Sequence, residues 1–296
     1  MTSHPARTLL GKLVALGLGL ALVAVALVIL VQPRMVRHHQ FDRCVTPLAL
    51  AGGLTSNPRK LDVAQMLVGS AENSSLYWEE QVGYLEYNVE GSDTWNRGYT
   101  GGIIGFTSKT SSMLELVRRY GVAAPDNPLA PFLPALETVN GTSSIAGLGP
   151  AYEEAWRTAA EDPVFLDTQL GLAHDWYLAP ALEQAQTDGL RPFGQFAYYD
   201  AMIQHGSSGF AAIHRDATAN AVRPSAGGEE TAWLQAFLDA RVDYMTQEVS
   251  TITATRVTTS QQGLLDAGEL DLRAPLSWEI YGDAFRIEVA PFCGRG

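Results

Sequence analysis

Residues 69–106 have the sequence GSAENSSLYWEEQVGYLEYNVEGSDTWNRGYTGGIIGF, which joins the end of a helical pattern to a glycine-rich strand pattern. Residues 61–73 (LDVAQMLVGSAEN) have apolar side chains at helical spacing, which predicts a helix with one buried face and Glu72 near its last turn. Residues 98–108 (GYTGGIIGFTS) combine isoleucine and aromatic residues with glycines suited to tight turns, which predicts a strand pair. This stretch decides the fold because it predicts a helix-end carboxylate close to a small sheet.

The remainder of the chain is mostly helical in pattern, with no internal repeats and no low-complexity tract. Four further segments have the apolar spacing of helices: 113–121, 151–189, 191–206 and 227–256. The first ends in glycine, as helices commonly do, and the second is expected to break at Pro163 and at Pro180. We therefore expect a mainly α (α+β) fold with one small β-sheet.

The N-terminal region contains an uncharged apolar run, residues 13–32 (LVALGLGLALVAVALVILVQ), about long enough to cross a bilayer as a helix. A short basic segment, 1–12, precedes it, and a linker, 33–45, follows it. A cleaved secretory signal normally has a shorter apolar core with a small-residue cleavage site behind it, whereas the Ala-x-Ala of this run lies inside the run. The sequence therefore favours a transmembrane signal anchor over a removed signal sequence. Either alternative places the domain predicted at 46–293 at the cell surface or in the extracellular space.

Two cysteines, Cys44 and Cys293, stand near the two ends of the predicted domain. Domain termini often lie close together, and an exported protein is in a compartment where a disulfide persists. We therefore predict a disulfide between Cys44 and Cys293, with two unpaired thiols in the tails as the alternative.

The acidic balance of the chain limits its partners. The formal net charge is −12, and residues 44–296 alone carry 15 basic against 31 acidic groups, a net of −16. Such a field repels nucleic acid and attracts cations. The six histidines are scattered, and the sequence has no H-E-x-x-H, C-x-x-C, G-x-S-x-G or P-loop motif. We expect a monomer with no metal, no cofactor and no nucleic-acid partner.

Carboxylates remain as the candidate catalytic groups. Two carboxyl groups that flank a glycosidic bond are enough for hydrolysis, because one protonates the leaving oxygen and the other activates water. A glutamate at the C-terminal end of a helix faces the negative end of the macrodipole, which disfavours its charged form. Partial burial beside Leu76 and Trp78 would act in the same direction. Glu72 is therefore a candidate general acid, with an ordinary solvated helix-end glutamate as the alternative.

Seven blocks of the sequence occur in the order found in one known enzyme family: AENSSL (71–76), RGYTGGIIGF (97–106), MLELV (113–117), LPALETVNG (133–141), GQFAYYDA (194–201), FLDAR (237–241) and LSWEIYGD (276–283). Through these blocks the chain resembles glycoside hydrolase family 46, the chitosanases, from about Leu61 to Ile287. The resemblance implies a two-lobed, lysozyme-like, mainly helical fold with the substrate cleft between the lobes. It also implies endo-acting, inverting hydrolysis of chitosan, the polymer of β-1,4-linked glucosamine.

The resemblance also implies roles for individual residues. Glu72 falls on the general acid of the family, Thr100 on the threonine that helps to hold the attacking water, and Arg97 on the arginine beside the base. The other matched positions are Asp200, Arg241 and Arg256, which look like a buried charge network behind the cleft, and Tyr177, His205 and Glu248, whose roles are less defined.

Two positions depart from the family pattern. Trp95 stands where the family has its aspartate base, in a turn that is longer here, so that Asp93 and Glu90 are alternative candidates for the base. Ser112 stands where the family usually has an aspartate that contacts an amino group of the substrate. The base is therefore open between two residues, and the binding of one sugar unit is expected to differ.

The charge of the chain agrees with a chitosan substrate, because a polyamine is attracted by a domain of net charge −16. Tyr84, Tyr177 and Trp95 are candidates to stack on sugar faces, with core packing as the alternative. Two other functions stay open: a non-catalytic binder of cationic glycan at the cell surface, and a lysozyme-like hydrolase of chitin or peptidoglycan.

Overall fold

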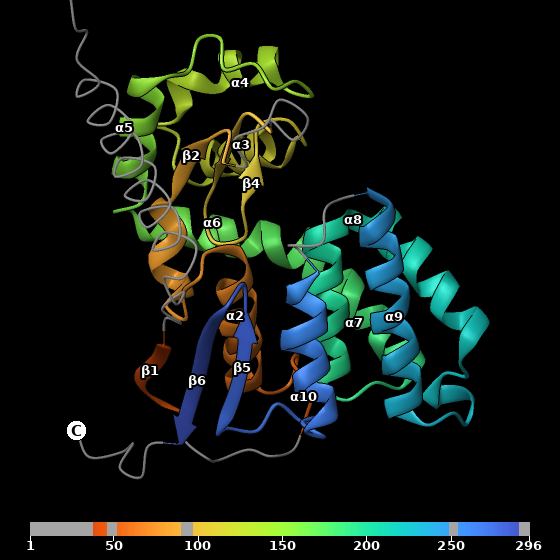
Figure 1. The fold of residues 1–296 in the computed structure, drawn as a ribbon. Helices are drawn as coiled ribbons and strands as arrows, with labels where there is room; N and C mark the ends of the chain where they lie inside the picture. The colour runs from red at the N-terminus through yellow and green to blue at the C-terminus, as the bar shows by residue number, and fades with distance from the viewer. Residues whose placement is uncertain (1–37, 46–51, 90–96, 249–253, 290–296) are drawn as a thin grey trace, which may run out of the picture. The chain divides into compact units, whose positions relative to one another are not determined.

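The structure is a computed structural model that describes residues 38–45, 52–89, 97–248 and 254–289 (Figure 1). All of these residues belong to one unit of the chain, His38–Gly296. No helix among them is long and apolar enough to cross a membrane. The predicted anchor at 13–32 and Cys293 lie outside the described residues, so the anchor and the disulfide stay predictions.

The prediction of a mainly helical chain with little sheet is confirmed. The α-helices are α2 Pro58–Glu72, α3 Ser112–Ala123, α4 Leu133–Val139, α5 Pro150–Ala159, α6 Pro163–Ala173, α7 Ala179–Asp188, α8 Pro192–Asn220, α9 Glu230–Glu248 and α10 Gln262–Asp266. Short 3₁₀ segments are η1 Trp78–Gly83, η2 Ala130–Phe132 and η4 Pro224–Ala226, and π-helical segments are η3 His174–Leu178 and η5 Arg256–Gln261. The strands are β1 His38–Val45, β2 Leu85–Tyr87, β3 Tyr99–Gly101, β4 Phe106–Thr107, β5 Leu276–Ile280 and β6 Asp283–Val289.

The strands form two small sheets rather than the single sheet expected. One sheet has the order β2-β3-β4 and is antiparallel, with Thr100 of β3 opposite Glu86 of β2 and Thr107 of β4. It confirms the strand pair predicted at 98–108. The other has the order β1-β6-β5, in which β1 runs parallel to β6, and β5 and β6 form a hairpin. The second sheet joins strands from the two ends of the domain, which a search for local patterns does not detect.

Helix α2 forms where its local sequence predicts it. Asn57 caps its start, since the side-chain oxygen accepts hydrogen bonds from the backbone N–H groups of Arg59 (3.2 Å) and Lys60 (3.4 Å). Pro58 occupies the first turn, where no N–H donor is needed. The apolar residues of the helix are buried in the main core, and Glu72 is its last residue.

The two predicted proline breaks had different outcomes. Pro163 starts α6, with the Asp162 side chain accepting a hydrogen bond from Val164 N at 2.9 Å, so the break before it is confirmed. The break at Pro180 is wrong, because helical structure continues from α6 through η3 into α7. Pro180 lies in the first turn of α7, and the wider π-helical turn before it accommodates a residue without an N–H donor.

Helix α8 extends beyond the segment predicted at 191–206. It continues to Asn220 with an interruption at Gly206, whose φ of 66° lies in the left-handed region that glycine tolerates. Helices α7 and α9 pack against α8 (Figure 1). The helix predicted at 227–256 corresponds to α9 and the start of η5, with residues 249–253 outside the described part. The interruption places His205 next to a kink within this long helix.

Candidate active site

Glu72 lies between the end of α2 and the β2-β3-β4 sheet. The neighbouring Asn73 donates a hydrogen bond from Nδ2 to Ile103 O (3.3 Å), which ties the helix end to the turn between β3 and β4. In that turn a Cβ on Gly105 would lie 3.5 Å from Glu72 Oε2 and 3.4 Å from Thr100 Cγ2. Glu72 and Thr100 therefore both lie within van der Waals distance of the same position in the turn.

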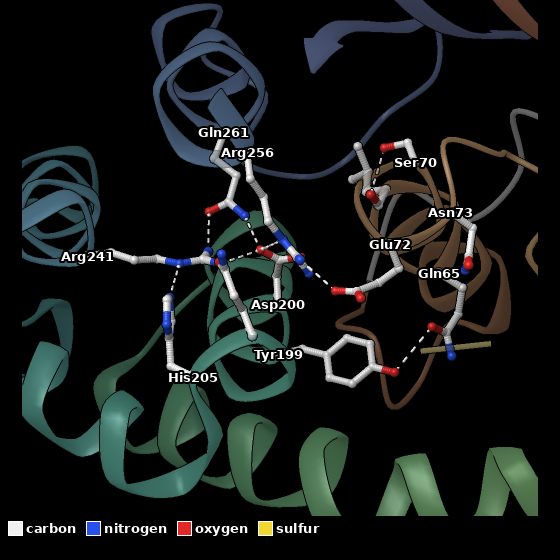
Figure 2. Close-up of polar contacts among 12 residues, drawn as sticks. Gln65, Ser70, Glu72, Asn73, Tyr199, Asp200, His205, Arg241, Arg256 and Gln261 are labelled. Carbon is white, nitrogen blue, oxygen red and sulfur yellow. Dashed lines mark hydrogen bonds and ion pairs between the residues drawn. The ribbon is translucent and has the colours of Figure 1, made fainter. Parts of the chain in front are cut away.

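Arg256 holds the other oxygen of Glu72, with 2.5 Å between Arg256 Nη1 and Glu72 Oε1 (Figure 2). The same guanidinium donates to Asp200 through Nη2 (2.7 Å) and Nε (3.0 Å). Asp200 also accepts from Arg241 Nη2 and from Gln261 Nε2, each at 2.7 Å. The side-chain exposed fraction rises from 0% and 1% at Arg241 and Asp200 to 5% at Arg256 and 20% at Glu72. The network thus leads from the interior to a carboxylate that solvent can reach.

Asp200 and His205 have defined charge states in this network. Burial alone would raise the pKa of Asp200, but the charges of Arg256 and Arg241 outweigh it and lower that pKa to about 2. His205 Nε2 accepts a hydrogen bond from Arg241 Nε at 3.1 Å, which requires a neutral imidazole. Burial and then the charges of Arg241 and Arg256 lower the pKa of His205 to about 3. Asp200 is therefore ionised and His205 neutral over the physiological pH range.

A cavity of about 400 Å³ is lined in part by Gly105, the glycine next to the Glu72 carboxylate. The segment that contains β3 and β4 contributes Arg97 and Gly105 to its lining, η3 contributes Tyr177, and α8 contributes Gln204 and His205. The burial of Tyr177 raises the pKa of its phenol, and the charge of Glu72 acts in the same direction. The arrangement puts a solvent-accessible acid next to Gly105, which lines this cavity. Among the described residues, no group of His, Cys, Asp and Glu has the geometry of a metal site.

The model of glycosyl hydrolase family 46 matches residues 66–276. The chain belongs to this family. A chitosanase from a Streptomyces species is 47% identical over 241 residues, which cover 80% of this chain and 85% of the relative. The co-crystal structure of a chitosanase with substrate has a TM-score of 0.74 at 45% identity, over 79% of this chain and 99% of that one. A family 46 chitosanase from Gynuella sunshinyii in complex with chitotetraose has a TM-score of 0.69 at 33% identity, over 77% and 96%.

Membership of family 46 confirms the resemblance inferred from the sequence blocks, and the structure shows where the matched residues lie. Glu72, Asp200, His205, Arg241 and Arg256 come together in one hydrogen-bonded network (Figure 2). The two residues proposed for the base, Asp93 and Glu90, lie outside the described residues, as do Trp95 and the side chains of Glu248 and Cys44.

Two candidates for substrate contact have defined surroundings. Tyr177 lines the cavity, whereas Tyr84 is not among its lining residues and donates its phenol O–H to Glu86 Oε2 at 2.9 Å. Ser112 stands where the family usually has an aspartate. It is buried and lines the cavity, and its Oγ accepts a hydrogen bond from Thr107 N at 2.9 Å. The Ser112 hydroxyl thus fixes the turn between β4 and α3.

Several residues of the site were not predicted from the sequence. Gln261 donates to Asp200 and accepts from Arg241 Nη1 (3.2 Å), and Gln204 Oε1 accepts from Arg241 Nη2 at 2.5 Å. Gly105 was predicted only as part of a strand turn. A glycine at a close approach between two elements has no side chain that would indicate a role. The signal that was available for Gly105 was its position inside the matched block RGYTGGIIGF.

Proposed function

We propose that this chain is an endo-acting chitosanase that hydrolyses β-1,4 bonds in chitosan, with Glu72 as the proton donor. One observation carries the assignment of the acid: Glu72 ends α2 with Oε1 bound by Arg256 and Oε2 next to Gly105, which lines the cavity. Because Arg256 occupies one oxygen, the second oxygen is the one that carries the proton to the glycosidic oxygen.

The hydrolytic step needs a water molecule activated on the opposite face of the sugar. Thr100 is the residue proposed to bind this water. It is buried in β3, and its Oγ1 has no hydrogen-bond partner among the described residues. A buried hydroxyl without a partner is costly, and a bound water satisfies it. In the proposed mechanism Thr100 orients this water, while Asp93 or Glu90 takes its proton as the bond to the leaving sugar breaks with inversion.

Chitosan is the proposed substrate for reasons of charge as well as family. The relatives whose names give an activity are chitosanases, and residues 44–296 carry a net charge of −16. A polyamine is attracted by such a field, and its association rate is expected to fall as salt is added. The cavity lined from the sheet side and from α8 supports a cleft that takes an extended chain.

The test of the acid is hydrolysis of glucosamine hexamer by the wild type and by Glu72→Gln. We expect the variant to lose about 10²- to 10⁴-fold in kcat, the contribution typical of a general acid. Glu154→Gln is the matched control, because that side chain is 71% exposed and remote in the chain. If Glu72→Gln kept most of the activity, the proton donor would be another residue. If the wild type bound chitosan and partly acetylated chitosan without product, the chain would be a glycan binder instead.

A second experiment addresses the base and the stereochemistry. The kinetics of Asp93→Asn and Glu90→Gln are compared with the wild type, and we expect one of the two to lose kcat as severely as the variant of the acid. Proton NMR of the first products from β-linked oligomers should show the α-anomer, since a single displacement inverts the anomeric carbon. Initial formation of the β-anomer would exclude the proposed water attack.

We also propose that the domain works outside the cytoplasm, held at the membrane by the apolar segment 13–32. The length of the segment and the position of its small residues support an uncleaved anchor. Fractionation of cells that express the full chain tests this, because an uncleaved anchor keeps the activity in the membrane fraction. Activity found in the medium, on a chain that begins after residue 32, would show that the segment is a removed signal.

A further inference from the structure

The β5–β6 hairpin contacts the helix end that carries Glu72. Trp278 of β5 donates a hydrogen bond from its indole Nε1 to Ser70 Oγ at 3.0 Å, between residues 208 positions apart in the chain. The Ser70 hydroxyl in turn donates to Leu67 O at 2.7 Å, so it is bonded on both sides. Ser70 is fully buried and lies in the last turn of α2, two residues before Glu72. Through Trp278 the hairpin therefore fixes the end of α2.

The other end of β5 contacts the segment that carries Arg256. The backbone N–H of Tyr281, in the hairpin turn, donates to Thr255 Oγ1 at 3.3 Å, and Thr255 directly precedes Arg256. One turn further along η5, Thr259 Oγ1 shares its O–H between Glu279 O and Thr255 O, each at 2.8 Å. The start of η5 is thus bonded to the hairpin at two places.

The hairpin is suited to hold two elements at a fixed separation. Its strands pair without a break in register from Leu276↔Ile287 to Ile280↔Asp283. The two-residue turn between them has φ of 55° at Tyr281 and 86° at Gly282, the positive values that tight hairpin turns require. Tyrosine rarely adopts such a backbone conformation, and residues held in it cluster at functional sites. The Trp278 ring stacks on Phe285 of β6 with 5.7 Å between centroids.

We infer that the β5–β6 hairpin sets the separation of Glu72 and Arg256, with Trp278 and Thr255 as positioning residues on its two sides. The inference rests on the role of Glu72 proposed above. On one side the hairpin fixes α2 through Ser70, and on the other side it fixes η5 through Thr255. The two fixed elements then contact each other through the ion pair of 2.5 Å between Arg256 Nη1 and Glu72 Oε1. A small misplacement of a catalytic group lowers the rate of the chemical step more than it changes substrate binding.

The test uses the full domain and glucosamine hexamer, with three substitutions. Thr255→Val removes the hydroxyl acceptor and keeps the branched shape, Thr255→Ser keeps the hydroxyl, and Trp278→Phe removes the indole donor and keeps an aromatic ring. We expect Thr255→Val and Trp278→Phe to lower kcat by about 10- to 100-fold with KM within about twofold of the wild type. We expect Thr255→Ser to restore most of the kcat. Thr258→Val is the control, because its hydroxyl donates to Ala254 O in the same turn and, among the described residues, makes no bond to the hairpin.

Each outcome decides between positioning and mere stability. An unchanged kcat in both Thr255→Val and Trp278→Phe would overturn the inference, and so would an equal loss in Thr255→Ser or in the control. If Trp278→Phe failed to fold, as judged by circular dichroism, the comparison of valine with serine at position 255 would still decide. Glu72→Gln is assayed alongside. If it were active, the proposed function would fail, whereas an inactive Glu72→Gln beside fully active Thr255→Val and Trp278→Phe would overturn the role of the hairpin alone.

Discussion

Replacing His205 with glutamine is expected to flatten the acid side of the stability curve of this protein. His205 Nε2 accepts a hydrogen bond from Arg241 Nε at 3.1 Å, so the folded state holds the ring neutral. Its pKa is about 3 in the folded protein against 6.5 ordinarily, because of burial and then the charges of Arg241 and Arg256. Glutamine does not titrate, and its amide oxygen can still accept from Arg241.

The sign and size of the effect follow from the two pKa values. Between about pH 3 and pH 6.5 the unfolded chain binds a proton on His205 that the folded protein does not, so unfolding becomes easier as the pH falls. The full contribution is present above pH 6.5 and is lost at about 1.4 kcal/mol per pH unit below it. At pH 5 the wild type has therefore lost about 2 kcal/mol from this group.

The assay is urea denaturation of both proteins at pH 7.5 and pH 5, with the difference between the two pH values as the readout. The other titrating groups are common to both proteins, so they cancel to a first approximation. We expect the wild type to lose about 2 kcal/mol more than His205→Gln does. His174→Gln is the control, because that ring is 60% exposed. Parallel pH dependence of the wild type and His205→Gln would refute the reasoning, since it would mean that His205 takes up its proton without unfolding.

Two other substitutions test the network and the turn beside it. Asp200→Asn leaves two buried guanidinium groups without their common anion and should cost about 3–5 kcal/mol of unfolding free energy, measured by chemical denaturation; a cost below about 1 kcal/mol would show that the network is not tightly coupled. Gly105→Ala should lower stability because its φ is +73°, and it should lower kcat because the added methyl group would stand in contact with Glu72 Oε2 (3.5 Å), the oxygen that must reach the substrate. Gly141→Ala is the matched control, with φ of +80° and nothing within 4 Å of the added Cβ. It should cost about 1–2 kcal/mol of stability and leave kcat unchanged, and equal kcat losses in both variants would contradict the proposed contact.

Local sequence patterns predicted the elements whose structure is decided by near neighbours. The helix at 61–73 and the strand pair at 98–108 have the apolar spacing, cap and glycines that their structures need, and both formed within a few residues of the predicted bounds. The helix predicted at 191–206 was too short, because a glycine such as Gly206 usually marks a helix boundary. Packing of α8 against α7 and α9 continues the helix beyond it, which is information outside any local window.

The contacts of the candidate site could be predicted only in part, because they join distant positions. Glu72 and Arg256 are 184 residues apart, and no spacing rule relates them. Family resemblance indicated Arg256, Asp200 and Arg241, the last two through the blocks GQFAYYDA and FLDAR. It did not indicate Gln261, because a glutamine gives no distinct signal until the carboxylate that it bonds is known.

The energetics of the buried charges favour a geometric role over a stabilising one. Desolvation offsets much of the attraction in a buried ion pair, so apolar residues of similar volume would give comparable stability. An apolar cluster, however, would not fix one oxygen of a carboxylate that solvent reaches. Arg256 does this because Asp200 holds its guanidinium through both Nε and Nη2, which leaves Nη1 directed at Glu72. Since the geometry of an acid affects the rate of catalysis more than folding, substitutions that preserve the charge of the network and shift Arg256 should reduce activity before they reduce stability.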